Sequence, residues 1–115
     1  MRLEKVQSQM RRGLLEYCIL LLLNREAAYS SDIIDRLKEA KLIVVEGTLY
    51  PLLTRLKNDG LLNYEWKEST QGPPRKYYEV TQEGRKFLAA LELSWQELNE
   101  SVKQIAIGEF KNNEQ

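Results

Sequence analysis

A short amphipathic helix that ends at a glycine, followed by two strand-like runs, accounts for residues 47–80. Its leucines recur at intervals of three, one and three residues, so they form one stripe of a helix. Gly60 suits the left-handed conformation that ends many helices. Residues 62–67 then alternate between apolar and polar side chains, and in residues 75–80 Tyr78 and Val80 share one face, as in half-buried strands. The leucines of the stripe are Leu49, Leu52, Leu53 and Leu56.

The segment between the two runs, residues 68–74, is polar and contains Gly72-Pro73-Pro74, so we expect a hairpin loop there. Arg75 and Lys76 stand where the second strand leaves this loop. A helix followed by a β-hairpin that carries basic residues is the element order of a winged helix. The sequence therefore predicts a mainly α fold with a small β wing, in which the leucine-striped helix is the recognition helix of a helix-turn-helix.

The face of this helix opposite the leucines carries hydroxyls, an amide and two cations, and no carboxylate before Asp59. Such a face suits a polyanion such as DNA. The residues expected to enter the major groove, at base edges, thymine methyls or phosphates, are Thr48, Tyr50, Pro51 and Thr54. The residues expected to bind phosphates are Arg55, Lys57, Arg75 and Lys76. The alternative is that Tyr50 is a core aromatic, Pro51 a tolerated kink and Thr54 plain surface.

Residues 10–24 predict a first helix that is apolar nearly all round. A chain of 115 residues, one modest domain, has few elements to cover such a helix. We therefore expect part of it, including Leu14 and Leu15, to pack against a partner chain. A second helix, capped by Ser30 or Ser31, runs to about residue 40 and supports the recognition helix. The apolar residues 42–45 are expected to form the first strand of a three-stranded wing sheet.

The last segment predicts a long helix that Thr81 caps and that runs from Gln82 to Gly108 or just before it. Its apolar residues recur at spacings of three and four, which is a heptad seam. A helix of about 25 residues is about 37 Å long, so its distal half projects beyond the domain. We therefore expect an obligate homodimer assembled by this helix and the first one. The seam residues are Leu88, Leu91, Trp95, Leu98, Val102 and Ile105.

The predicted organisation is a winged-helix DNA-binding domain over residues 1–81, a dimerisation helix over residues 82–108 and a flexible polar tail over residues 109–115. The net charge is zero, but its distribution is uneven. It is +3 over residues 1–13, −2 over residues 14–46, +2 over residues 47–86 and −3 over residues 87–115. The basic parts are those expected to touch DNA. Their small excess predicts binding that needs two half-sites per dimer and weakens steeply with salt.

Two blocks of the sequence are distinctive. One is Thr48-Leu49-Tyr50-Pro51-Leu52-Leu53 with Arg55-Leu56 and Asp59-Gly60-Leu61-Leu62, and the other is Gly72-Pro73-Pro74-Arg75-Lys76-Tyr77-Tyr78 with Thr81 and Gly84. They resemble the PadR family of bacterial winged-helix transcriptional regulators, and the similarity runs from about Met10 to Ile105. The resemblance implies a dimeric repressor that binds a palindromic operator in double-stranded DNA and is often relieved by a small molecule.

The sequence departs from the family pattern at two places. Ser30-Ser31 stand where Gly-Tyr is common at the second helix, which bears on a phosphate contact and makes both serines DNA-binding candidates. Val45-Glu46 stand where Ser-Pro commonly opens the recognition helix, which removes a good N-cap. Ser94-Trp95 is similar to the short, multidrug-sensing branch, in which a Trp lines a pore between protomers and stacks on planar aromatic ligands. The alternative for Trp95 is packing within the dimer interface.

Composition argues against an enzyme. The chain has no His, its single cysteine, Cys18, lies inside the apolar first helix, and no phosphate-binding loop or metal-ligand spacing is present. We expect Cys18 to be a small buried hydrophobe, and no metal or cofactor. The N-terminus does not resemble a cleavable signal and the apolar run at residues 19–23 is too short for a bilayer, so we expect a cytoplasmic protein. The alternative function is a winged-helix module that binds a protein instead of DNA.

Overall fold

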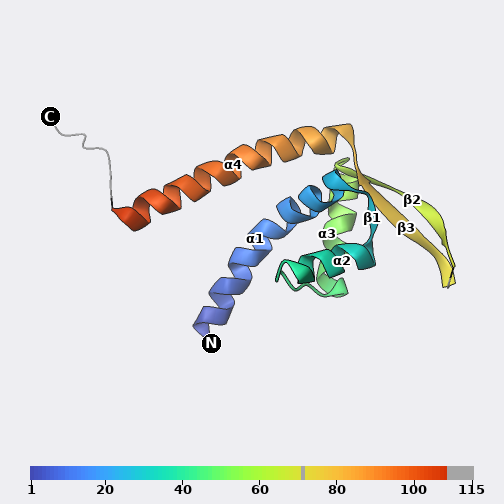
Figure 1. Cartoon of the computed structure of the whole chain (residues 1–115), viewed down its shortest axis with the longest axis horizontal. Helices are drawn as coiled ribbons and strands as arrows, with labels where there is room; N and C mark the ends of the chain where they lie inside the picture. The colour runs from blue at the N-terminus through green and yellow to red at the C-terminus, as the bar shows by residue number, and fades with distance from the viewer. Residues whose placement is uncertain (71, 109–115) are drawn as a thin grey trace.

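The computed structural model describes residues 1–70 and 72–108, which form four α-helices and three β-strands (Figure 1). The expected mainly α fold with a small β wing is confirmed. The tail predicted for residues 109–115 lies outside the described residues. The elements in chain order are α1 (Arg2–Arg25), β1 (Ala28–Tyr29), α2 (Ser30–Glu39), α3 (Glu46–Asn58), β2 (Leu62–Ser69), β3 (Gly72–Val80) and α4 (Gln82–Ile107).

The core lies where α2, α3 and the sheet meet the C-terminal half of α1. The four leucines of the predicted stripe in α3 are all buried, and Leu49, Leu53 and Leu56 have no exposed surface at all. They pack in one cluster with Ile19 and Leu20 of α1. Burying side chains of this size stabilises the fold by about 1.5–3 kcal/mol each, so this stripe fixes the position of α3.

The first helix begins at Arg2, eight residues before the predicted start at residue 10. Its first turn is stabilised by Glu4, whose carboxylate lies 3.3 Å from the N-terminal ammonium of Met1 and favours the positive end of the helix dipole. Gly13 does not interrupt the helix. The polar composition of residues 2–9 concealed this extension, because a helix that leaves the core needs no apolar stripe on its own domain.

The sheet is antiparallel with the strand order β1-β3-β2. The predicted first strand at residues 42–45 is wrong, because the third strand is formed by Ala28 and Tyr29, which pair with Tyr78 and Tyr77 of β3. Residues 42–45 are a loop in which only Val44 is buried, at 8% exposure. A segment of two residues has no periodicity, and the pairing that makes it a strand comes from β3, about fifty residues away.

The hairpin strands are longer than predicted. β2 continues to Ser69 and β3 begins at Gly72, so Gly72-Pro73-Pro74 belongs to the strand and not to the loop. β1 pairs only with residues 77 and 78 of β3. At the two prolines, the edge of β3 that faces β1 therefore has no partner strand among the described residues. A register irregularity between Lys67 and Ser69 relaxes the pairing on the other side. Prolines are tolerated at such edges and bulges because they interrupt no ladder hydrogen bond there.

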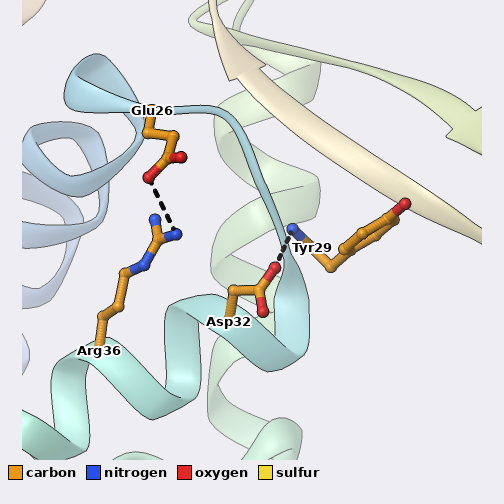
Figure 2. A network of polar contacts seen from close by, with 4 residues as sticks. All are labelled: Glu26, Tyr29, Asp32 and Arg36. Carbon is orange, nitrogen blue, oxygen red and sulfur yellow. Dashed lines mark hydrogen bonds and ion pairs between the residues drawn. The ribbon is translucent and has the colours of Figure 1, made fainter.

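The start of α2 differs from the prediction, because neither Ser30 nor Ser31 caps it. The helix begins at Ser30, and the carboxylate of Asp32 accepts a hydrogen bond of 3.1 Å from the backbone N–H of Tyr29 (Figure 2). The Arg36 guanidinium also donates to the Glu26 carboxylate at 3.2 Å, so α2 is fastened to the end of α1. The Asp32 contact fixes the first turn of α2, where both serines lie, and the Arg36 contact holds its last turn against the end of α1.

The last helix starts and ends as predicted. The Thr81 hydroxyl accepts a hydrogen bond of 2.9 Å from the backbone N–H of Gly84 and donates one of 2.6 Å to the Gly60 carbonyl. Gly108 ends the helix with a φ of 79°. A Cβ on Gly84 would collide with the Leu61 carbonyl oxygen, so the start of α4 lies directly on the backbone that follows α3.

The first turns of α4 pack on α1 through Leu88, which is buried, and Leu91, which is half-buried. The rest of α4 leaves the domain, and the N-terminal half of α1 leaves it in a different direction (Figure 1). A helix of 26 residues is about 39 Å long. Among the helices of residues 1–70 and 72–108, none is both long enough and apolar enough to span a membrane.

Candidate nucleic-acid interface

The outer face of α3 is open to solvent. Thr48, Tyr50, Pro51 and Thr54 are all exposed, and Tyr50 has 44% of its surface accessible, so it lies outside the core. Pro51 has no backbone N–H, so the carbonyl four residues earlier, at Gly47, has no helical donor. Gly47 is exposed as well, so the start of the helix is accessible from outside the chain.

One flank of α3 faces α2 and the wing. The hydroxyl oxygens of Tyr50 and Ser30 lie 3.0 Å apart, which joins α3 to the first turn of α2. Next to this pair is a hollow of about 280 Å³ between the outer face of α3 and the base of the hairpin. Its lining combines hydroxyls, aromatic rings and two cations: Ser30, Tyr50, Thr54, Trp66, Arg75, Lys76 and Tyr78.

The wing cations, Arg75 and Lys76, lie against aromatic rings. The Lys76 Nζ atom is 4.5 Å from the centre of the Tyr64 ring and 5.5 Å from that of Trp66. The Arg75 guanidinium lies 4.5 Å from the centre of the Tyr29 ring and donates a hydrogen bond of 3.3 Å to the Ser31 hydroxyl. The rings orient the cations without neutralising them, so both keep their charge for an anion.

The two cations of α3 differ in their partners. The Arg55 guanidinium lies 3.6 Å from the Glu16 carboxylate of α1, so part of its charge is compensated. The Lys57 Nζ atom lies 5.9 Å from the Tyr64 ring. In the part of the chain that the structure describes, Lys57 and the wing cations form no ion pair with a carboxylate. Of the cations on α3 and the wing, those without a carboxylate partner therefore lie on the wing side of the helix.

The aromatic side chains of the wing were not among the predicted site residues. Trp66 lies opposite Lys76 in the hairpin. Its side chain is 62% exposed, so the wing presents a large aromatic surface to solvent. Tyr78 is buried, and burial raises the pKa of its hydroxyl above the ordinary value, with smaller contributions from Tyr50 and Tyr64. The alternation in residues 62–67 placed Trp66 on the face of Leu62, but its neighbours depend on the strand register.

The residues predicted for dimerisation fall into two groups. Leu15 and Leu88 are buried within the core of the single chain, Leu91 is half-buried against it, and Leu14 is half-buried. The seam residues farther along α4 are open to solvent, with exposed fractions of 39% for Trp95, 63% for Leu98 and Val102, and 66% for Ile105. The part of the predicted seam that the single chain leaves exposed is therefore the distal half of α4.

Cys18 is half-buried in α1, and burial raises the pKa of its thiol above the ordinary value. At neutral pH it is protonated and packs as a small apolar side chain. Within residues 1–70 and 72–108, the Cys, Asp and Glu side chains form no group of three that could hold a metal ion.

Comparisons with known proteins agree with one another. The model of the transcriptional regulator PadR-like family matches residues 19–90. The solved structure of a PadR-like transcription factor from Bacteroides fragilis is 72% identical, covering 88% of this chain and 98% of that one, with a TM-score of 0.75.

Two further solved structures, each 35% identical, are similar over most of their length. The match to the PadR family transcriptional regulator from Eggerthella lenta covers 90% of this chain and 91% of that protein's chain, with a TM-score of 0.84. The match to a PadR-like transcriptional regulator from Bacillus cereus covers 88% of this chain and 99% of that protein's chain, with a TM-score of 0.77.

Proposed function

Because the chain belongs to the PadR-like family of transcriptional regulators, we propose that it binds a palindromic operator as a homodimer and represses transcription there until a small molecule releases it. The observation that carries this proposal is the arrangement around α3. From Gly47 to Asn58 its solvent-exposed outer face has no carboxylate, the one acidic residue of the helix being Glu46 at its start, and the wing cations beside it have no ion-pair partner among the described residues. A regulator of this kind acts in the cytoplasm, where bacterial DNA lies.

In this proposal α3 enters the major groove. Thr48, Tyr50, Pro51 and Thr54 are the candidates for base contacts, since all four side chains are exposed on its outer face. Phosphate contacts come from Lys57, Arg55 and the wing cations. Ser30 orients the Tyr50 side chain, and Ser31 orients the Arg75 guanidinium. Of the two α3 cations, Lys57 is the stronger candidate because Glu16 already compensates Arg55.

A homodimer is supported by apolar surface that the single chain leaves open. On α4 this is the distal seam of Trp95, Leu98, Val102 and Ile105, and on α1 it is Leu3, Val6 and Met10, which are 56%, 39% and 66% exposed. The two segments also have opposite charge, since residues 1–10 have a net charge of +1 and residues 87–108 one of −2. The projecting half of α1 in one protomer therefore suits the distal half of α4 in the other.

The proposed effector is a planar aromatic molecule held at Trp95. This side chain is 39% exposed at the point where α4 leaves the core, so a twofold axis near it would bring two indoles together. Two such rings can stack on both faces of a planar or cationic molecule. The competing interpretation is that the paired indoles only pack against each other.

Selection of bound DNA from a random pool tests the central proposal, because it reports binding, symmetry and half-site spacing together. We expect enrichment of a twofold-symmetric sequence whose half-site centres are about 10–10.5 base pairs apart, or a multiple of this. A mobility-shift assay on the protein's own promoter region at two salt concentrations is the second measurement. If the protein retains no duplex at low ionic strength, the proposal fails and a winged-helix module that binds another protein takes its place.

A further inference from the structure

The recognition helix has a second flank, which faces α1 instead of the wing. Thr48 and Arg55 are seven residues apart and therefore lie on the same side of α3. Arg55 forms its ion pair with Glu16 of α1. Thr48 lines a hollow of about 240 Å³ to which α1 contributes Arg11 and Arg12. Helix α3 thus lies between two pairs of cations, the wing cations on one side and the α1 cations, Arg11 and Arg12, on the other.

The α1 cations do not belong to the apolar stripe proposed for the partner chain. Ser8, Arg11, Arg12 and Leu15 all line the hollow, and their spacing of three and four residues places them on one face of α1. Leu15 is buried, so this face is the continuation of the core-facing side beyond the end of the core. Leu3, Val6 and Met10 lie on the side of α1 opposite the face that carries Arg11 and Arg12. The N-terminal half of α1 therefore has two separate surfaces, one basic and one apolar.

The charge of the α1 cations is not compensated locally. Both side chains are exposed, and within the described part of the chain neither forms an ion pair. The hollow contains no carboxylate: its remaining lining is the Thr48 and Ser8 hydroxyls and the aliphatic loop at residues 42–45. The nearest acidic residue along α1, Glu16, is engaged by Arg55, and Glu46 of α3 lines a different hollow. Both guanidinium groups are open to solvent, so an anion can reach them from outside the chain.

We infer that Arg11 and Arg12 bind the phosphate backbone of DNA on the wall of the major groove opposite the wing. This inference rests on the proposed function. The major groove is about 12 Å wide and an α-helix with its side chains is about 10–12 Å across, so a helix seated in the groove has a phosphate strand along each side. The wing reaches one strand, and α1 is the element beside α3 on the other. Guanidinium groups match phosphate oxygens in a bidentate geometry.

The test compares the wild-type protein with R11A/R12A, measuring affinity for the selected operator and for an unrelated duplex between 0.05 and 0.2 M salt. We expect at least about tenfold weaker binding of both duplexes at the lower salt concentration. The slope of log affinity against log salt should fall by about 0.9 for each phosphate that the variant no longer binds, or by about 3.6 for the four arginines of a dimer. R11K/R12K should keep most of the slope, because it keeps the charge.

The matched control is R25A/K38A, which removes two exposed cations from the end of α1 and from α2. It should bind DNA as the wild type does. Circular dichroism and light scattering accompany every variant. An unchanged salt slope in folded, dimeric R11A/R12A overturns the inference. Dissociation of R11A/R12A into monomers also overturns it and assigns the pair to the protein interface. Failure of wild type and control alike to bind any duplex defeats the proposed function itself, which distinguishes the two.

Discussion

The hydroxyl groups of Tyr50 and Ser30 lie 3.0 Å apart and join the outer face of α3 to the first turn of α2. This contact holds the Tyr50 ring beside the wing hollow while leaving 44% of the side chain exposed. A side chain fixed in this way presents one geometry to the major groove. Changes to either hydroxyl should therefore affect which sequences are bound as well as how tightly.

We expect Tyr50→Phe to lower discrimination between the operator and single-base variants by about 0.5–1.5 kcal/mol, the usual worth of one hydrogen bond. Ser30→Ala should have a similar effect, and the double variant should lose less than the sum, because the two residues share one contact. Competition binding against a set of operator variants measures this. Equal losses on every sequence would mean that Tyr50 does not read bases.

Lys76→Ala should weaken binding to all sequences by a similar factor, because its Nζ atom is a point charge held by the Tyr64 and Trp66 rings. The slope of log affinity against log salt should fall by about 1 for each protomer. Salt titration of a mobility shift provides the measurement. Lys103→Ala, which removes an exposed cation from the distal part of α4, serves as the control and should leave the slope unchanged. A sequence-dependent loss would assign Lys76 to base recognition instead.

Leu98→Glu should convert the dimer to a monomer at micromolar concentration, because it places a charge in the exposed seam of α4. Leu93→Glu is a closely matched control: Leu93 is also 63% exposed and lies on the same helix, but on the side away from the seam. Light scattering gives the mass of each variant. A dimeric Leu98→Glu protein, or a monomeric wild type, contradicts assembly through α4.

A protein with Trp66→Phe retains Trp95 as its single tryptophan, so its fluorescence reports this site alone. Titration with a planar cationic dye should quench that fluorescence and lower operator affinity, and additional Trp95→Ala should abolish both effects. If the dye neither quenches nor weakens operator binding, Trp95 serves only to pack the interface. A changed dimer mass in the Trp95→Ala variant would support the same conclusion.

Gly84→Ala should destabilise the protein by about 1–3 kcal/mol, since the added methyl group collides with the Leu61 carbonyl and with Val80. Thermal or denaturant unfolding followed by circular dichroism measures this. Gly13→Ala is the control, because a Cβ there meets no atom within 4 Å and the residue lies inside α1. That change should stabilise the protein by up to about 1 kcal/mol. An unaffected Gly84→Ala variant would show that α4 can shift at no energetic cost.

Local signals allowed the ends of α4 and the stripe of α3 to be predicted from the sequence. Thr81 and Gly108 act on the backbone within a few residues, and the leucine spacing of α3 is a property of one helix. The early start of α1 was missed because residues 2–9 project from the core, so that burial does not shape their sequence. The basic face that Arg11 and Arg12 form farther along α1 gains meaning only from its position beside α3, and only the structure shows that position.

The parts of the wing that depend on distant partners could not be predicted correctly. β1 exists because Tyr29 meets Tyr77, with their rings 5.0 Å apart, whereas residues 42–45 have the composition of a strand but no partner. The cap of α2 was assigned to a serine because serines are good N-caps, yet Asp32 reaches the free N–H of Tyr29 from the third helical position. Competing local choices of this kind are decided by tertiary contacts.

Thr81 alone separates β3 from α4, and its hydroxyl is bonded to both Gly60 and Gly84. Because a single residue with two hydrogen bonds joins them, we expect α4 and the wing to rotate together. With an arm of about 39 Å, a tilt of about 5° displaces the far end by about 3 Å, comparable to the rise of one base pair. A molecule bound between the α4 helices of two protomers would thus shift the two recognition helices away from their operator half-sites without contacting either helix.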